Sequence, residues 1–370
     1  MSAAEVDCGE VSKDCQSGCQ LGDFDAEAKV IAVVGATGTG KSSLADVLAR
    51  TLGGEVISAD SMQVYRGMDI GTAKVPLAER STAYHCIDLV DPSVPFTAAA
   101  YQRAARTAIE EVRARGLQPI VCGGTGLYVR AALDDFIFDE NRFATAPETE
   151  QLEASSGLVP SPNTALRNQL TKQADEMGAE AFHAELAQQD PASAALIHPN
   201  NVRRVIRAFE LLDEGTSYAE QQADFSEYKA YYATKYVGVE VSHEVLYEVV
   251  NRRVDTLMAN GLLEEVQALV KQGYQNYPSF SQAIGYKELL GVLDGTETLG
   301  VAVERIKQAT RRYAKRQRTW FKRDARITWI HATELHKERL AGTLSNEEFT
   351  LALQEKTLEA LQVPQERINC

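Results

Sequence analysis

The segment from Gly35 to Ser42 reads GATGTGKS and matches the G-x-x-x-x-G-K-[ST] pattern of a phosphate-binding loop. Glycines allow such a loop to curl until its backbone N–H groups converge on phosphate oxygens. Lys41 adds a full positive charge, and the hydroxyl of Ser42 is a suitable ligand for Mg²⁺. We therefore expect a di- or triphosphate to bind the loop residues, which are Gly35, Ala36, Thr37, Gly38, Thr39, Gly40, Lys41 and Ser42.

A second candidate for chemistry is Asp60, which directly follows the strand-like segment 55–59. In an open α/β sheet, the carboxyl end of such a strand faces the ligand crevice. A carboxylate beside a phosphate site could take a proton from an attacking nucleophile. A lone aspartate in this place is, however, more often a helix cap or a turn residue. A kinase or hydrolase would also need a Walker-B acid ending a later strand, for which the segment 87–91, with Asp88 and Asp91, is only a weak candidate on its flanking residues.

The elements that would position these residues alternate between strand and helix patterns. Apolar strand-like runs occur at 30–34, 55–59, 87–90 and 119–122, and helical spacing occurs at 41–52 and 96–115. This alternation predicts βαβ units around a parallel sheet, so the expected fold class is α/β with a P-loop NTPase-like core. Further along the chain we expect helices at 164–177, 179–189, 244–260, 262–271 and 299–324, and strands at 235–241 and 325–331.

The predicted organisation is one core interrupted by an insertion. It comprises a disordered acidic tail (1–28), a first part of the core (29–138), a mostly helical insertion (139–202), a second part of the core (203–331) and a C-terminal helical tail (332–370). Cys8, Cys15 and Cys19 of the acidic tail lack the fourth ligand of a zinc site. The first third of the insertion, 141–163, is rich in Ser, Thr, Pro and Asn and predicts a mobile leader.

Composition excludes several classes of protein. The chain has 370 residues, of which 44% are hydrophobic and 24% charged, as in an ordinary globular protein. No apolar run approaches the roughly 20 residues that cross a bilayer, and the first residues lack the features of a secretory signal. Six cysteines form no disulfide framework, so we expect a cytoplasmic protein. The net charge of −14 argues against a protein that coats nucleic acid by overall charge.

One segment of this acidic chain is strongly basic. Between Arg305 and Arg326 there are ten Lys or Arg residues and one acid, Asp324, which gives a local charge of +9. Such a run is usually just a solvated helix face, but it could also contact nucleic acid phosphates. Interleaved aromatic residues, Tyr313 and Trp320 among them, could stack on splayed bases. Arg203, Arg204 and Arg207 form a second basic cluster at helical spacing.

Five further stretches, with the phosphate loop, resemble the tRNA dimethylallyltransferases, also called tRNA isopentenyltransferases. They occur in the family's order over roughly 30–324, and they read DSMQVYRGMDIGTAK (60–74), GGTGLYVR (123–130), DPASAALIHPNNVRRVIRAFE (190–210), FSQAIGYKE (280–288) and QATRRYAKRQRTWFK (308–322). The resemblance implies transfer of a five-carbon group from dimethylallyl diphosphate to N6 of the adenine on the 3′ side of the anticodon, with Mg²⁺. No Cys/His zinc finger follows residue 330, which indicates a bacterial type.

The resemblance also implies roles for single residues. Asp60 would be the base, Thr125 would contact the reacting region and the bridging oxygen of the diphosphate, and Arg253 would bind the diphosphate. His243 and Val249 stand where relatives often carry arginines. The insertion would face the tRNA. The implied contacts to the anticodon loop of tRNA come from Asp60, Ser61, Met62, Gln63, Thr125, Arg167, Arg203, Arg204, Arg207, Gln282, Gly285, Tyr286, Lys315, Arg316, Arg318, Trp320 and Lys322.

Three alternatives are open at this point. An adenylate isopentenyltransferase would use free AMP, ADP or ATP, for which a basic helix and a large insertion would be superfluous. A P-loop small-molecule kinase or NTPase would need a better Walker-B acid than the segment 87–91 offers. A pure RNA-binding module would not need an intact phosphate loop beside Asp60. We expect a monomer that contacts no membrane.

Overall fold

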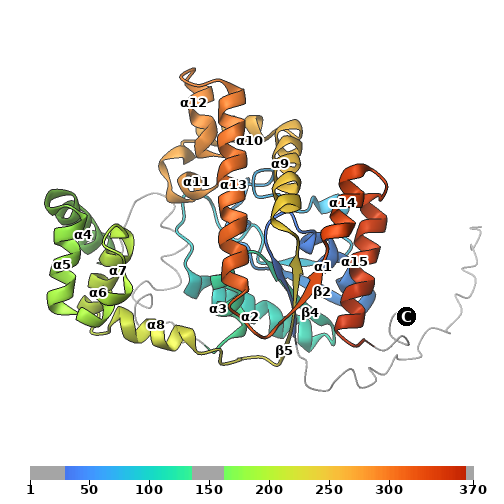
Figure 1. Ribbon diagram of the computed structural model, residues 1–370, viewed down its shortest axis with the longest axis horizontal. Helices are drawn as coiled ribbons and strands as arrows, with labels where there is room; N and C mark the ends of the chain where they lie inside the picture. Colours follow the sequence, from blue (N-terminus) through green and yellow to red (C-terminus); the bar gives the residue numbers. More distant parts are fainter. Residues whose placement is uncertain (1–29, 136–161, 364–370) are drawn as a thin grey trace, which may run out of the picture. The chain divides into compact units, whose positions relative to one another are not determined.

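The computed structural model describes residues 30–135 and 162–363, and within them six strands form one parallel sheet (Figure 1). The strand order is β3-β2-β4-β1-β5-β6. Every residue of β1 is buried, as expected for a central parallel strand covered on both faces. The predicted α/β class is therefore confirmed. The strands are β1 (Val30–Gly35), β2 (Gly54–Ser58), β3 (Tyr84–His85), β4 (Gln118–Gly123), β5 (Thr234–Glu240) and β6 (Ile327–His331).

The third strand differs from its prediction at 87–90. It comprises only Tyr84–His85, which pairs with β2, and Val90 forms an isolated bridge with Tyr65 instead. Cys86 and Asp88 have φ angles of 59° and 57°, in the left-handed region, so the chain cannot stay extended through them. The prediction was wrong because hydrophobicity alone does not report a backbone reversal.

Helices pack on the sheet within the described residues. α1 (Lys41–Leu52) begins directly after the phosphate loop and ends at Gly53, whose φ of 61° suits a left-handed helix cap. The other helices of this part are α2 (Ala98–Ala114), α3 (Gly126–Leu133), α9 (His243–Ala259), α10 (Leu262–Lys271), α11 (Pro278–Gln282), α12 (Leu290–Leu293) and α13 (Leu299–Phe321), with short 3₁₀ turns at Leu77–Glu79, Tyr274–Asn276 and Lys287–Leu289.

The C-terminal helices belong to this core rather than forming a separate tail. α14 (Thr333–Ala341) and α15 (Asn346–Ala360) follow β6, and α15 packs against α1. Phe349 and Leu353 are buried in the same hydrophobic cluster as Leu48 of α1 and Val33 of β1. Burying Phe349 removes a large apolar side chain from water, so these helices help to hold the sheet together.

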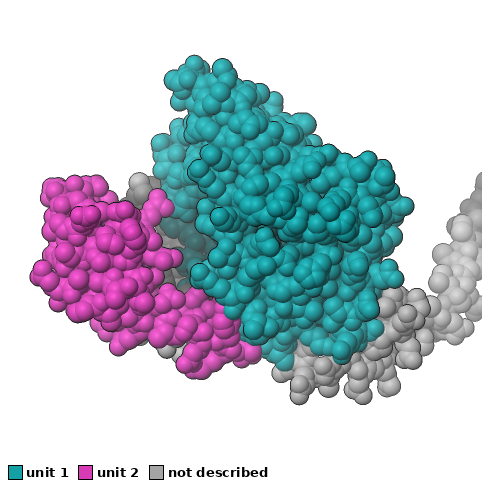
Figure 2. Space-filling view, in the orientation of Figure 1, with its two compact units in different colours: residues 1–129, 232–370 teal, residues 130–231 magenta. Residues whose placement is uncertain are grey.

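Contacts divide the chain into two compact units (Figure 2). The second unit spans 130–231 and has its own core, in which the rings of Phe182 and Phe209 are 5.0 Å apart. It extends beyond the predicted insertion at 139–202 because α7 packs on α4 and α5 instead of joining the sheet. Its helices are α4 (Pro162–Met177), α5 (Ala179–Gln189), α6 (Pro191–Leu196), α7 (Val202–Asp213) and α8 (Tyr218–Ser226).

None of the helices within the described ranges is both long and apolar enough to span a bilayer. The predicted acidic tail, with Cys8, Cys15 and Cys19, lies outside the described residues. Nearly all of the predicted mobile leader also lies outside them.

Candidate active site

The phosphate loop joins the central strand β1 to α1 as predicted. Gly38 and Gly40 have φ angles of 85° and 91°, which glycine adopts without strain. In the described part of the chain, the backbone N–H groups of residues 38–43 donate to no protein acceptor. Thr39 is buried, and its hydroxyl donates to the carbonyl of Ala36 over 2.9 Å, which closes the loop. A run of open N–H groups at the start of a helix is an anion site.

Two cations lie at this loop. The Lys41 ammonium group donates to the carbonyl of Ala36 over 3.3 Å. Desolvation lowers the pKa of Lys41 and of Arg253, the Arg253 charge lowers that of Lys41 further, and the Asp60 carboxylate opposes the shift in both. Arg253 thus lies within electrostatic reach of Lys41 and Asp60. Two desolvated cations within electrostatic reach of each other bind a polyanion favourably, because it supplies the missing counter-charge.

Val249, at a position where the resemblance implied an arginine, packs beneath the loop. It is buried, and its Cγ1 is 3.3 Å from the place a Cβ of Gly38 would take. His243, at the other replaced position, packs its ring on Tyr247 with centroids 4.2 Å apart. Val249 therefore adds no positive charge to the site that Lys41 and Arg253 form.

Asp60 lies just past the carboxyl end of β2, on the sheet edge that carries the phosphate loop. The strand hydrogen bonding continues through Ala59, whose N–H donates to the carbonyl of Cys122 over 2.7 Å. One carboxylate oxygen, Oδ1, accepts from the N–H of Met62 over 2.9 Å, which fixes the side chain. Within the described residues Oδ2 accepts no hydrogen bond. It is free to accept a proton from a substrate.

Thr125 is held against the Asp60 turn by the pairing of β4 with β2. Its N–H donates to the carbonyl of Ala59 over 3.1 Å, and its Oγ1 accepts from the N–H of Ser61 over 3.0 Å. The close approach requires glycine at 123, where a Cβ would lie 2.1 Å from the Ala59 oxygen. The structure therefore brings together Asp60 and Thr125, the two residues that sequence placed on separate motifs.

Tyr313 of α13 completes this side of the site. Its hydroxyl lies near the side chains of Thr125 and Gln317. Burial, with the nearby Asp60 charge, raises the pKa of Tyr313 to about 12, so the phenol stays protonated and can donate. Tyr313 is partly buried, so the structure leaves part of its side chain exposed beside Thr125.

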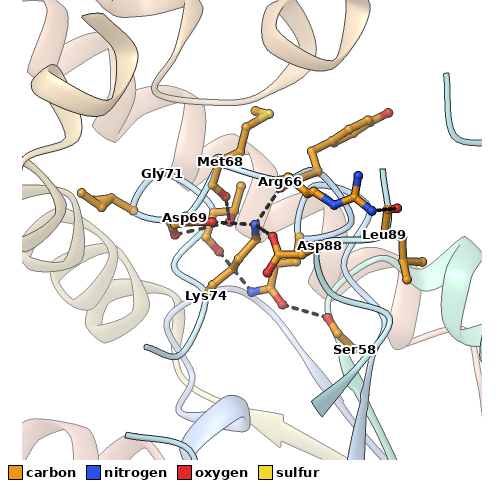
Figure 3. A network of polar contacts seen from close by, with 12 residues as sticks. Ser58, Arg66, Met68, Asp69, Gly71, Lys74, Asp88 and Leu89 are labelled. Atoms are coloured by element: carbon orange, nitrogen blue, oxygen red, sulfur yellow. Dashed lines mark hydrogen bonds and ion pairs between the residues drawn. The ribbon is translucent and has the colours of Figure 1, made fainter. Parts of the chain in front are cut away.

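Gln63 and Lys74 shape the loop that carries Asp60. The Gln63 amide accepts from the Ser58 hydroxyl over 2.8 Å and donates to the carbonyl of Thr72 over 3.2 Å. Figure 3 shows the Lys74 ammonium group between Asp69 and Asp88. Lys74 is buried, and its charge is neutralised by these two carboxylates. The Gln63 amide, predicted to contact tRNA, is thus engaged inside its own loop.

The same network engages Asp88, one of the two acids of the Walker-B candidate segment 87–91. Asp88 forms an ion pair with the buried Lys74, and its backbone N–H donates to the carbonyl of Gln63 over 3.1 Å. Its carboxylate therefore holds the 60–74 loop rather than a metal at the phosphate loop. The structure supplies no support for a Walker-B role of Asp88.

Glu265 of α10 is a residue that the sequence did not single out. Its carboxylate accepts from the N–H groups of Ile70 (2.7 Å) and Gly71 (3.0 Å), and from the hydroxyl of Tyr286 (2.7 Å). Tyr286 is 0% exposed, and a Cβ on Gly71 would lie 2.3 Å from its ring. The predicted tRNA contact of Tyr286 is therefore wrong in this structure, because the side chain is buried in the core. Gly285 is buried beside it, and Gln282 is exposed.

The basic helix α13 carries fewer unpaired charges than its sequence indicates. Acids from other elements neutralise several of its cations. Lys315 and Arg316 are exposed and have no acidic partner in the described residues, and Trp320 packs against Gly126, where a Cβ would lie 1.9 Å from Nε1. Pairs with acids of other elements join Arg305 to Glu297, Lys307 to Asp255, and both Arg318 and Lys322, the residue that follows the helix, to Glu240.

The second unit contains the other predicted basic cluster. Arg167 and Arg207 both pair with Glu210, which is only 3% exposed, so they balance a buried charge. Arg203 and Arg204 are exposed and have no acidic partner among the described residues. Of the three cations of the cluster, Arg207 thus balances a buried carboxylate, as Arg167 does from outside the cluster, and Arg203 and Arg204 remain available.

Among the described residues, no group of three His, Cys, Asp or Glu side chains could hold a metal. A phosphate-bound Mg²⁺ does not require one, since it takes most ligands from phosphate and water. The predicted ligand Ser42 is partly exposed in the first turn of α1, among the open N–H groups. These residues fit a Mg²⁺ ion that is bound together with a polyphosphate.

A loop of open N–H groups between a central parallel strand and its following helix places this chain among the P-loop proteins. The comparisons with known proteins narrow this class. A family model described as IPP transferase matches residues 63–324. Two similar proteins are the tRNA dimethylallyltransferases of Geobacillus thermodenitrificans (44% identical over 311 residues, 84% of this chain and 92% of the relative) and Bacillus subtilis (42% over 305 residues, 82% and 91%).

The comparison with solved structures leads to the same family. A full-length tRNA isopentenylpyrophosphate transferase from Bacillus halodurans is 37% identical, with a TM-score of 0.60 over 92% of this chain and 98% of that one. A eukaryotic dimethylallyltransferase acting on tRNA is 28% identical, with a TM-score of 0.65 over 87% and 79%. The chain belongs to the IPP transferase family. The resemblance seen in the sequence motifs is confirmed.

Proposed function

We propose that this protein transfers the dimethylallyl group of dimethylallyl diphosphate to N6 of the adenine on the 3′ side of the anticodon in tRNA, and releases diphosphate. One observation carries the proposal. The open N–H groups of residues 38–43 and the cations Lys41 and Arg253 lie within electrostatic reach of Asp60, whose Oδ2 is free. An anion site beside a proton acceptor suits a reaction that expels diphosphate while it deprotonates an amine.

Each residue of the site has a separate role in the proposed reaction. An exocyclic adenine amine is a poor nucleophile, so Asp60 Oδ2 takes its proton as the new C–N bond forms. The C–O bond between the dimethylallyl group and the diphosphate breaks, and its electron pair leaves with the diphosphate. Lys41, Arg253 and the loop N–H groups stabilise that developing charge. Thr125, which contacts the Asp60 turn, would lie at the bridging oxygen.

Mg²⁺ would supply further neutralisation of the diphosphate charge when it is bound. Ser42 is the residue of this chain that would hold it.

The tRNA would be bound by the exposed cations of both units. In the first unit these include Arg312, Lys315 and Arg316. Ser61 and Met62, which follow Asp60, and the exposed Gln282 would add further contacts. In the second unit, Arg203 and Arg204 have free guanidinium groups. Phosphate contacts of this kind supply affinity that depends on salt. A free adenylate would need none of them, which favours tRNA as the acceptor.

A single assay tests the proposal. The protein is incubated with Mg²⁺, labelled dimethylallyl diphosphate and either unmodified tRNA or AMP, and we expect label in the tRNA alone. Asp60→Asn keeps the shape of the side chain but removes the base, so kcat should fall by about 10²–10⁴-fold. Binding of tRNA should persist. Asp175→Asn, an exposed acid of α4, is the matched control and should leave kcat unchanged.

The other outcomes identify the rivals. Label in AMP alone would make the protein an adenylate isopentenyltransferase. Phosphoryl transfer from ATP without prenyl transfer would make it a kinase. Normal kcat in Asp60→Asn would remove Asp60 from the mechanism.

A further inference from the structure

Gln317 is a buried side chain that connects α13 to the phosphate loop. It is only 5% exposed, its Oε1 accepts from the N–H of Thr37 over 2.8 Å, and its Nε2 donates to the carbonyl of Gly124 over 2.9 Å. The two bonds fix which end of the amide faces the loop. Glycine at 124 makes room for it, since a Cβ there would lie 2.2 Å from Nε2. The side chain therefore fills a defined place rather than a loose gap.

Gln317 divides the donors of the phosphate loop into two sets. Toward α1, the N–H groups of residues 38–43 have no protein partner in the described chain. Toward β1, the N–H of Thr37 is taken by Gln317, and the carbonyl of Ala36 accepts from both Thr39 and Lys41. The helix end of the loop is thus open to an anion, and the strand end is already satisfied by the protein.

The length of a polyphosphate determines how much of such a loop it needs. Phosphate loops hold nucleotides through backbone N–H groups and the motif lysine, which together contact adjacent phosphoryl groups. Two phosphoryl groups can be served by the helix end with Lys41 and Arg253. A third phosphoryl group, placed further along the loop toward β1, would meet the Thr37 N–H, whose hydrogen is already bonded to Gln317. It would also meet the buried Gln317 amide itself.

We propose that Gln317 makes the loop selective for a diphosphate by occupying the Thr37 N–H and the adjoining space, and so excludes triphosphates. This inference rests on the proposed function of the loop as the diphosphate site. The loop motif also occurs in nucleotide-binding proteins, so it does not by itself distinguish a diphosphate from a triphosphate. In this inference, Gln317 makes that distinction. Selectivity matters here, because a triphosphate bound in the loop would block the prenyl donor.

The test compares two inorganic probes by calorimetry on the full-length protein at fixed free Mg²⁺. Wild type should bind diphosphate more tightly than tripolyphosphate. In Gln317→Ala, the freed N–H and space should let tripolyphosphate gain about tenfold or more in affinity relative to diphosphate, since a hydrogen bond to a charged group has about that effect. A gain of binding cannot come from misfolding.

Two further variants separate the causes. Gln317→Leu frees the N–H but keeps the space filled, so its preference for diphosphate should stay close to that of wild type. Gln308→Leu changes an exposed glutamine of the same helix and should change neither affinity. If Gln317→Ala does not fold, Gln317→Ser is measured in its place and should show the same gain for tripolyphosphate. An unchanged ratio in the folded small variant would overturn the inference.

Lys41→Met distinguishes this inference from the function on which it rests. If Lys41→Met loses diphosphate binding, the loop is the diphosphate site, whatever result the Gln317 variants give. If wild type does not bind diphosphate, or Lys41→Met binds it unchanged, the proposed function of the loop fails.

Discussion

At the scale of single residues, His336 shows how the C-terminal helices reach the phosphate loop. Its Nε2 is 3.3 Å from the carbonyl oxygen of Thr39, and its Nδ1 is 3.2 Å from the guanidinium of Arg339. A carbonyl can only accept, so Nε2 carries the hydrogen and Nδ1 accepts from Arg339. The ring also packs edge-on against Phe349, with centroids 4.6 Å apart. A second proton on Nδ1 would face the Arg339 charge inside the core.

The pH dependence of stability follows from this geometry. Burial, and then the Arg339 charge, lowers the pKa of His336 from 6.5 to about 4. Between these values the unfolded chain binds more protons than the native one, so unfolding free energy is lost as pH falls from 6.5 toward 4. The loss has an upper bound of about 3 kcal/mol. Urea unfolding at several pH values should show a shallower pH dependence for His336→Asn than for wild type.

His198→Asn is the control for this prediction, because His198 is an exposed histidine of the second unit. Its pH dependence should match that of wild type. Parallel curves for wild type and His336→Asn would show that His336 does not titrate in this window.

At the scale of elements, α13 shows that the charge of a segment differs from the charge its surface presents. The sequence gives +9 between residues 305 and 326, but Glu297, Asp255 and Glu240 come from other elements to pair with it. Arg312 and Lys315 are exposed, three residues apart on one face, and have no acidic partner in the described chain. A tRNA phosphate would meet these two without first displacing a carboxylate.

Replacing Arg312 and Lys315 by alanine should therefore weaken tRNA binding and reduce the slope of log K against log salt by about 1.5 units. The matched control is Arg305→Ala with Lys307→Ala, which removes the same charge from the same helix at paired positions. Its slope should stay at the wild-type value. The affinities are measured by filter binding over a series of salt concentrations. Equal slopes in both double variants would show that this face of α13 does not contact phosphate.

At the scale of the whole molecule, the two compact units differ in what they contain. The first holds the phosphate loop, Asp60 and Thr125, and the second holds a small helical core with Arg203 and Arg204 on α7. Since no residue of the diphosphate site belongs to the second unit, its cations serve the tRNA alone in our proposal.

Arg203→Ala with Arg204→Ala should raise KM for tRNA severalfold and leave KM for dimethylallyl diphosphate unchanged, because the phosphate loop, Lys41 and Arg253, which bind the diphosphate in our proposal, all belong to the first unit. Steady-state kinetics with each substrate varied in turn measures both values. Lys172→Ala, which removes an exposed lysine of α4 paired with Glu176, is the control. An equal KM for tRNA in the double variant and wild type would assign the second unit another role.

The sequence alone determined the parallel α/β core, the phosphate loop, the positions of Asp60 and Thr125, and the family. These could be predicted because they depend on local patterns. A buried parallel strand is a run of apolar residues, and a phosphate loop needs glycines at fixed spacing before a lysine.

Only the tertiary structure decided which polar side chains are free. Tyr286 and Gln63 are engaged within the protein, Asp88 is paired with Lys74, and Glu265 and Gln317 hold loops from distant elements. The physical reason is that a hydrogen bond or an ion pair joins residues far apart in the chain, such as Thr37 and Gln317. Sequence spacing reports the face of a helix or strand, and the partner on that face is set by packing.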